Sequence, residues 1–181
     1  MDMLDDPSMK EVVDDFCLEA LSLFGELEDI LDDLEENPNN SQQLEKFGQI
    51  IDRVMGAAKS LGADQAGTMC ELGKIIGYKS SQVEDANLRE ITIAVMFDLV
   101  DILIQMIKNL QAGKGLTLTE INTDAFVKRL KWLSEKFKAI ERSSVAVVAD
   151  DVAEAADAAT AKDAGSMDQG NIDDLLGSLG L

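Results

Sequence analysis

The chain has 181 residues, enough for one domain of ordinary size followed by a tail. Apolar residues make up 46% of it, aromatic residues only 4%, and there are two prolines, which favours helices over sheets. A formal net charge of −19 argues against nucleic acids and anionic membranes as partners. Because histidine is absent, a histidine base, a histidine metal ligand and a phosphohistidine are all excluded.

The charge pattern and the cysteines indicate the cellular compartment of the protein. Residues 1–40 carry 14 acidic residues and one basic residue, and this acidic N-terminus lacks the features of a secretory signal. Cys17 and Cys70 lie in apolar stretches without zinc spacing, as buried thiols in a reducing compartment would. Residues 91–110 form the most apolar window, but two aspartates there would each cost about 2.5–3.5 kcal/mol in a bilayer. We therefore expect a cytoplasmic protein without a membrane span.

Hydrophobic spacing predicts five helices in residues 1–143. Pro38, Gly62 and Gly77 are expected to end the first three, and glycines at 113 and 115 to end the fourth. Thr117 and Glu120 match a capping box for the fifth. The expected ranges are 7–36, 41–61, 64–76, 81–112 and about 117–142.

The same spacing predicts which side chains face the core. In the last helix, five apolar residues step by four and three, as in a heptad seam, and the outer face is basic. That face could lie against the acidic first helix or meet an acidic partner. The expected inward residues are Val12, Phe16, Ala20, Leu23, Leu27, Ile30 and Leu34 in the first helix; Leu44, Phe47, Ile51, Val54 and Ala58 in the second; Leu88, Ile91, Val95, Leu99, Ile102 and Met106 in the fourth, with a second row Phe97, Val100, Ile104 and Ile107; and Phe126, Leu130, Leu133, Phe137 and Ile140 in the fifth.

The C-terminal part of the chain, residues 144–181, differs from the preceding helices in composition. Residues 144–167 are rich in Ala and Asp and contain few large apolar residues. Their burial could not offset the conformational entropy that the segment would lose on folding, which predicts a flexible linker. Residues 168–181 read DQGNIDDLLGSLGL, in which Ile172, Leu175, Leu176 and Leu179 form one apolar helical face behind Asp173 and Asp174. So short a segment should become helical only when it docks. The sequence therefore predicts an all-α fold: a helical bundle with a long helical hairpin, a disordered linker and a C-terminal docking peptide.

One polar stripe interrupts the apolar fourth helix. Asp98, Asp101, Gln105 and Lys108 are spaced by three, four and three, so they lie on one side of the helix. Such a stripe is most often the solvated face of an amphipathic helix. The functional alternative is that Asp101 and Gln105, one turn apart, enter a partner's site together.

Two segments resemble one family. DILIQMIKNLQ (101–111) is similar to the active-site helix of the chemotaxis phosphatase CheZ, in which an Asp and a Gln lie four residues apart. The tail DQGNIDDLLGSLGL resembles the CheZ tail, which binds the response regulator CheY. The two segments occur in the order of that family and cover about a quarter of the chain.

The first half departs from the usual CheZ pattern, because three helices precede the hairpin. LEALSLFGELEDILDDLEENPNN (18–40) looks like the first helix of histidine-phosphotransfer (HPt) domains. The segment nearest to the His-x-x-Lys-Gly motif of those domains begins with Gly56 in the histidine position. This divides residues 1–143 into an HPt-like part, 1–80, and a catalytic hairpin, 81–143.

The CheZ resemblance implies a hydrolase that removes the aspartyl phosphate of a CheY-like regulator and so acts on flagellar rotation. Gln105 would orient the attacking water and Asp101 would engage the regulator's active-site lysine. The protein would need no cofactor, since the regulator supplies its own Mg2+. We expect a homodimer, because the fourth and fifth helices offer more apolar surface than one hairpin can bury. The alternatives are a non-catalytic, HPt-type adaptor for a regulator or kinase, and a purely structural bundle.

Overall fold

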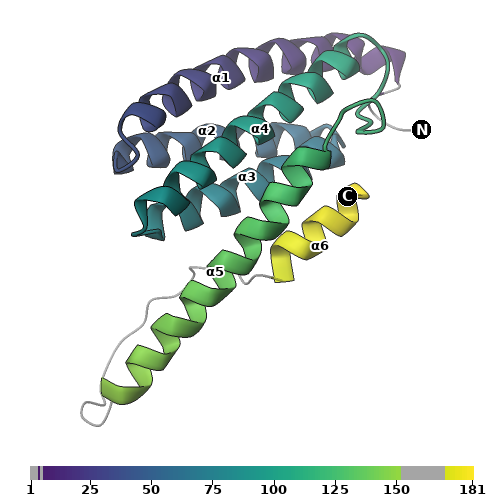
Figure 1. Ribbon diagram of the computed structural model, residues 1–181. Coiled ribbons are helices and arrows are strands. Elements are labelled where there is room, and N and C mark those ends of the chain that lie inside the picture. Colours follow the sequence, from purple (N-terminus) through teal and green to yellow (C-terminus); the bar gives the residue numbers. More distant parts are fainter. Residues whose placement is uncertain (1–3, 5, 152–169) are drawn as a thin grey trace, which may run out of the picture.

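The computed structural model describes residues 4, 6–151 and 170–181, with side chains outside 140–171 (Figure 1). All regular structure in this part of the chain is helical, as the sequence predicted. A 3-10 turn, Pro7–Met9, precedes α1. The α-helices are α1 (Lys10–Glu36), α2 (Ser41–Ser60), α3 (Asp64–Gln82), α4 (Ala86–Gln111), α5 (Asp124–Asp151) and α6 (Gly170–Leu179).

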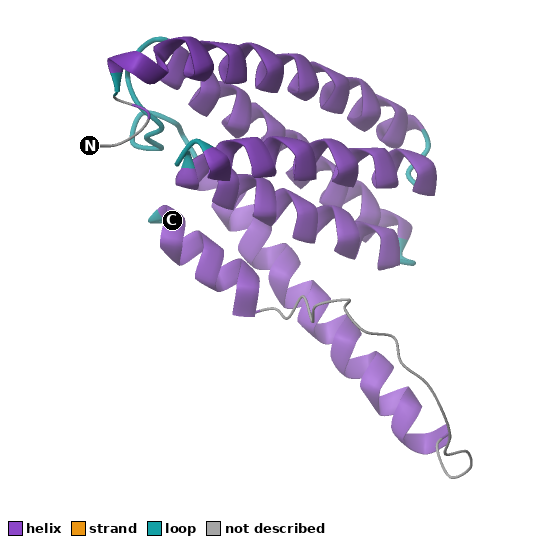
Figure 2. Ribbon diagram, turned by 180° about the vertical axis from the view of Figure 1, so that it is seen from behind, coloured by secondary structure: helices purple, strands orange, loops and turns teal. Residues whose placement is uncertain are grey.

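Four helices form the main bundle. α1 packs against α2 and α4, and α3 packs against the same two helices, so that a common core runs between them (Figures 1 and 2). α5 packs against α4 near its start and then projects from the bundle, whereas α6 lies against α3. The largest fully buried side chains, among them Phe24, Phe47, Met96 and Leu103, belong to α1–α4.

Short polar turns hold the helix ends. Asn40 caps α2 by accepting a hydrogen bond from the amide of Gln43, and Asp85 caps α4 by accepting one from the amide of Leu88 at 2.9 Å. Gly62 follows α2 with a φ of 74°, a conformation that other L-residues rarely adopt. The predicted stops at Pro38 and Gly62 are therefore confirmed, and each lets the next helix return along the bundle.

The predicted end of the third helix at Gly77 is wrong. α3 continues through Gly77 to Gln82, and α4 begins at Ala86 rather than near 81. A Cβ placed on Gly77 would lie 3.3 Å from the ring of Phe47. The glycine is therefore a point of close contact between α3 and α2, where the missing side chain lets the helices approach.

The bounds of the last long helix, α5, also differ from the prediction at both ends. α5 starts at Asp124, and the Thr117 hydroxyl instead bonds within its own loop, accepting from the Thr119 amide at 3.1 Å. At its other end α5 continues to Asp151, so the first residues of the predicted flexible linker are helical. The remainder of that prediction, residues 152–167, lies outside the described residues.

Most of the predicted core faces are confirmed. Val12 is an exception: it is 46% exposed, whereas Val13 is buried. The buried face at the start of α1 runs through Val13, Phe16, Cys17 and Ala20, and Val12 lies at its edge. Ile91 is also only partly covered, at 36% exposure, and the predicted Ile140 lies outside the described side chains. Cys17 and Cys70 are free and buried, as expected. Within the described residues, no helix combines the length and apolarity needed to cross a membrane.

Candidate functional site

Asp101 and Gln105 lie on the solvent face of α4. Both side chains are exposed, and neither has a hydrogen-bond or ion-pair partner within the described part of the chain. Beneath them Ile102, Leu103 and Met106 are buried, which holds the helix against the bundle. The two polar groups are one turn apart, about 6 Å, and so present a carboxylate and an amide from a rigid support.

The stripe continues on both sides of this pair. Lys108 is exposed one turn beyond Gln105. Asp98, at the other end, is partly covered and accepts a hydrogen bond from the guanidinium of Arg129 in α5. This ion pair joins the outer face of α5 to the polar stripe of α4. The structure thus brings all four stripe residues to one surface and assigns Asp98 a role in holding α5.

The outer face of α5 contains a residue that the sequence reasoning did not single out. Trp132 is 45% exposed, and the Lys136 ammonium lies 5.2 Å from the centroid of its ring. Arg129, Trp132 and Lys136 follow a spacing of three and four, so they share a face. A lone tryptophan at an otherwise basic surface is a signal that the sequence already carried, since tryptophan and arginine are enriched where proteins bind each other.

The C-terminal segment is helical, and its apolar face is buried in its own chain. Ile172, Leu176 and Leu179 are buried and Leu175 is half-buried, all in the main hydrophobic core. α6 lies against α3, beside α5, in both views of the molecule (Figures 1 and 2). The side chains predicted to bind a partner therefore contact the bundle here.

Polar contacts complete the docking of α6. Asp173 and Asp174 point to solvent, and a carboxylate oxygen of Asp173 lies 3.8 Å from the Nζ atom of Lys138 in α5. Near the same end of α5, Lys79 of α3 is 5% exposed with its ammonium 5.6 Å from the ring centroid of Phe137. We call the surface of α3 and α5 that receives the tail the α6 seat.

The tail also ends in a defined cap that the sequence reasoning missed. Gly180 has a φ of 76°, and the amide of Leu181 donates to the carbonyl of Leu176 at 3.0 Å. This is a Schellman arrangement, in which the residue after the glycine returns to the apolar face of the helix. Leu181 accordingly packs against the core. A glycine followed by leucine after an apolar helical face was the available signal.

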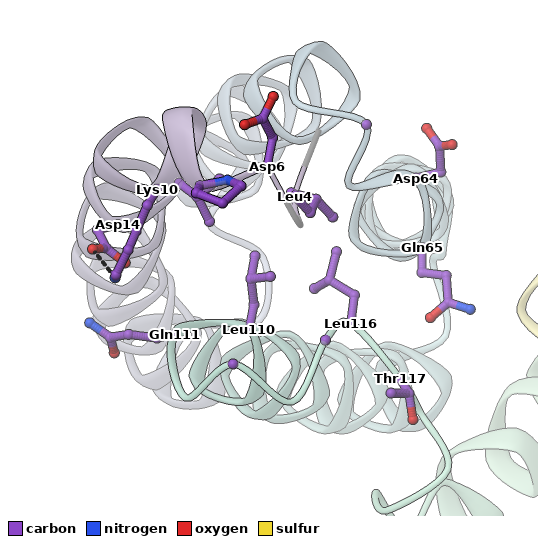
Figure 3. A pocket seen from close by; sticks show the side chains of 15 residues that line it. Leu4, Asp6, Lys10, Asp14, Asp64, Gln65, Leu110, Gln111, Leu116 and Thr117 are labelled. Atoms are coloured by element: carbon purple, nitrogen blue, oxygen red, sulfur yellow. Dashed lines mark hydrogen bonds and ion pairs between the residues drawn. The ribbon is translucent and has the colours of Figure 1, made fainter. Parts of the chain in front are cut away.

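A cavity of about 670 Å3 lies at one end of the bundle, beyond the end of α4 (Figure 3). Leu4, Leu110 and Leu116 point into it, whereas Asp64 points away. Lys10 and Asp14, which also line it, are paired with each other at 2.7 Å. Neither Asp101 nor Gln105 lines this cavity, and it gathers no pair of reactive groups.

The remaining predicted features are placed as follows. Gly56 is exposed on α2, so the position that would carry a phosphorylated histidine in an HPt domain has no side chain. The described residues contain no cluster of acidic or cysteine side chains suited to a metal ion. Comparison of the chain with models of known families, with curated proteins and with solved structures found no match.

Proposed function

We propose that the protein hydrolyses the aspartyl phosphate of a CheY-like response regulator. The observation that carries the proposal is the pair Asp101 and Gln105, exposed on one face of α4 and without a partner among the described residues. The resemblance of residues 101–111 and 168–181 to CheZ supplies the substrate class. The protein acts in the cytoplasm and needs no cofactor of its own, because the regulator holds its own Mg2+.

In this mechanism Gln105 positions the attacking water. A neutral amide can donate one hydrogen bond and accept another, so it can hold a water in line with the phosphorus without a pKa near seven. Each 1.4 kcal/mol that positioning removes from the barrier gives about a tenfold acceleration. The buried face of α4 limits the movement of Gln105, which is the condition that such positioning requires.

Asp101 has a separate role. Its carboxylate would pair with the active-site lysine of the regulator and so orient α4 against the phosphorylated site. Because Asp101 and Gln105 are one turn apart on the same face, a single approach of α4 can place both groups. The absence of internal partners for Asp101 in the described chain supports this role, since no existing ion pair has to break first.

The basic outer face of α5 provides a docking surface for the regulator. An acidic surface on the regulator, beside its phosphorylation site, would complement the charges of Lys128, Lys131 and Lys136. These three side chains are exposed, and the Asp98–Arg129 ion pair makes their surface continuous with the catalytic stripe. Trp132 lies within it and offers a large apolar contact.

The direct test is the replacement Gln105→Ala. With the regulator phosphorylated by acetyl phosphate, we expect the variant to lose at least tenfold in the rate of phosphate release, because the water is no longer held. Gln42→Ala, at an exposed position on α2, is the matched control and should behave as the parent protein. Parent-like activity of the Gln105 variant would contradict the proposal.

A second candidate is a non-catalytic, HPt-type adaptor that binds a regulator or a kinase. The exposed Gly56 favours it over an active phosphotransfer domain, because this position cannot carry a phosphoryl group. The same assay separates the two functions. An adaptor would bind the regulator and leave the lifetime of its phosphate unchanged.

A further inference from the structure

The apolar face of α6 has two uses that exclude each other. The proposed function needs Ile172, Leu176 and Leu179 to contact a regulator, whereas in the free chain they are buried against α3. One face of a ten-residue helix cannot be buried against both surfaces at once. Binding of the tail to a regulator therefore requires that α6 first leave its seat.

We propose that the α6 seat is an internal competitor of the regulator, which holds the tail docked until a regulator displaces it. This proposal rests on the proposed function and adds a means of regulating it. A tail that is docked for nine-tenths of the time binds its partner about tenfold more weakly than a free tail, since only the undocked fraction is competent. The stability of the seat thus sets the regulator concentration at which recruitment begins.

Two features make the docking reversible. α6 has only ten residues, too few for a stable isolated helix, so its helicity depends on the surface that it contacts. The ion pair between Lys138 of α5 and Asp173 of α6 is long at 3.8 Å, and its two side chains are 30% and 59% exposed, so this pair contributes little. Both aspartates at the start of α6 are exposed in the docked state, so a partner can reach them before α6 leaves its seat.

A reversible cross-link tests the competition in the full chain. Lys138→Cys and Asp173→Cys place two thiols at the contact, and a short bifunctional thiosulfonate reagent can join them. The native cysteines do not interfere, because both are buried. Burial also raises the pKa of Cys17 to about 11 and that of Cys70 to about 12, so both carry far less reactive thiolate than an exposed cysteine does. Each single variant treated with the same reagent is the control for labelling alone.

The probe is a CheY-like receiver loaded with beryllium fluoride, which mimics the phosphorylated state. We expect the double variant to cross-link within one chain, the linked form to bind this receiver at least tenfold more weakly, and reduction to restore binding. Circular dichroism of the linked and reduced forms checks that both are equally helical. Slow cross-linking, or equal affinity of linked and reduced forms, would overturn the competition.

The same experiment distinguishes the two proposals. A chain that cross-links and binds the receiver only when reduced, yet leaves its phosphate lifetime unchanged, would support the seat and contradict the phosphatase. A chain that accelerates phosphate loss equally with the tail linked and free would support the phosphatase and overturn the seat. A reduced chain that never binds the receiver would contradict both.

Discussion

At the scale of single residues, Asp101 and Gln105 show how much of a site the spacing of residues in the sequence can predict. The spacing predicted that they share a face, and both are exposed there. It could not show that Asp98, on the same stripe, is paired with Arg129, because the two lie 31 positions apart and meet only through the packing of α5 on α4. Val12 and Val13 make a similar point: periodicity finds the apolar face, but which residues at its edge are buried depends on the helices that pack against it.

Cys70 gives a prediction for the dependence of stability on pH. Burial raises the pKa of its thiol from 9.0 to about 12, so the folded state holds this proton more tightly than the unfolded state does. The resulting stability is fully present below pH 9 and is lost as the pH rises toward 12, by up to about 1.4 kcal/mol per pH unit. Urea unfolding at pH 8 and pH 10 measures it. Cys70→Ala should show a smaller decrease between these two pH values, and an identical decrease would refute the assignment.

At the scale of helices, two glycines that look alike in sequence have opposite surroundings. A Cβ on Gly25 of α1 would meet nothing within 4 Å, whereas one on Gly73 of α3 would lie 3.0 Å from a methyl carbon of Leu99. Gly25→Ala should therefore raise the free energy of unfolding by about 0.5–1 kcal/mol through lower backbone entropy. Gly73→Ala should lower it by about 1–3 kcal/mol by overpacking. Thermal unfolding of both variants measures the difference, and a shift of the same sign in both would count against this packing.

These glycines also explain why helix boundaries were the weaker part of the prediction. A glycine that ends a helix and one that lets two helices approach have the same sequence signature. Gly62 ends α2, whereas Gly77 lies inside α3 against Phe47, and only the position of the neighbouring helix distinguishes them.

The outer face of α5 gives a second prediction for an element. Lys131→Glu combined with Lys136→Glu should raise the KM for a phosphorylated regulator about three- to tenfold at low salt, with little change in kcat. Added salt should reduce the difference from the parent protein, because exposed charges are screened. Lys46→Glu, at an exposed site on α2, is the matched control. An effect confined to kcat would mean that this face does not dock the regulator.

At the scale of the whole molecule, the apolar surface of α4 is covered mainly by helices of its own chain, whereas the prediction assigned it to a second copy of the chain. The expectation of a homodimer depended on apolar surface that one hairpin could not bury, and α1 and α3 of the same chain cover most of it. A homodimer stays a prediction. Sedimentation equilibrium at micromolar concentration measures it, and a monomer there would refute it.

The position of the tail could not be predicted from the sequence for a general reason. An amphipathic pattern specifies that one face will be buried, but it carries no information on whether the covering surface belongs to the same chain or to another. Ile172, Leu176 and Leu179 satisfy the pattern equally in either case. Deciding between them requires the seat, which α3 and α5 assemble from distant parts of the sequence.

The seat also has a consequence for how the protein is made. A ribosome releases α3 and α5 before α6, because α6 follows them in the chain. The surface of α3 that Ile172, Leu176 and Leu179 cover thus stays open to water until the chain has emerged at least as far as Leu179. During that interval the nascent bundle presents an apolar patch to chaperones and to neighbouring nascent chains. A messenger truncated before α6 would yield a product that keeps this patch permanently.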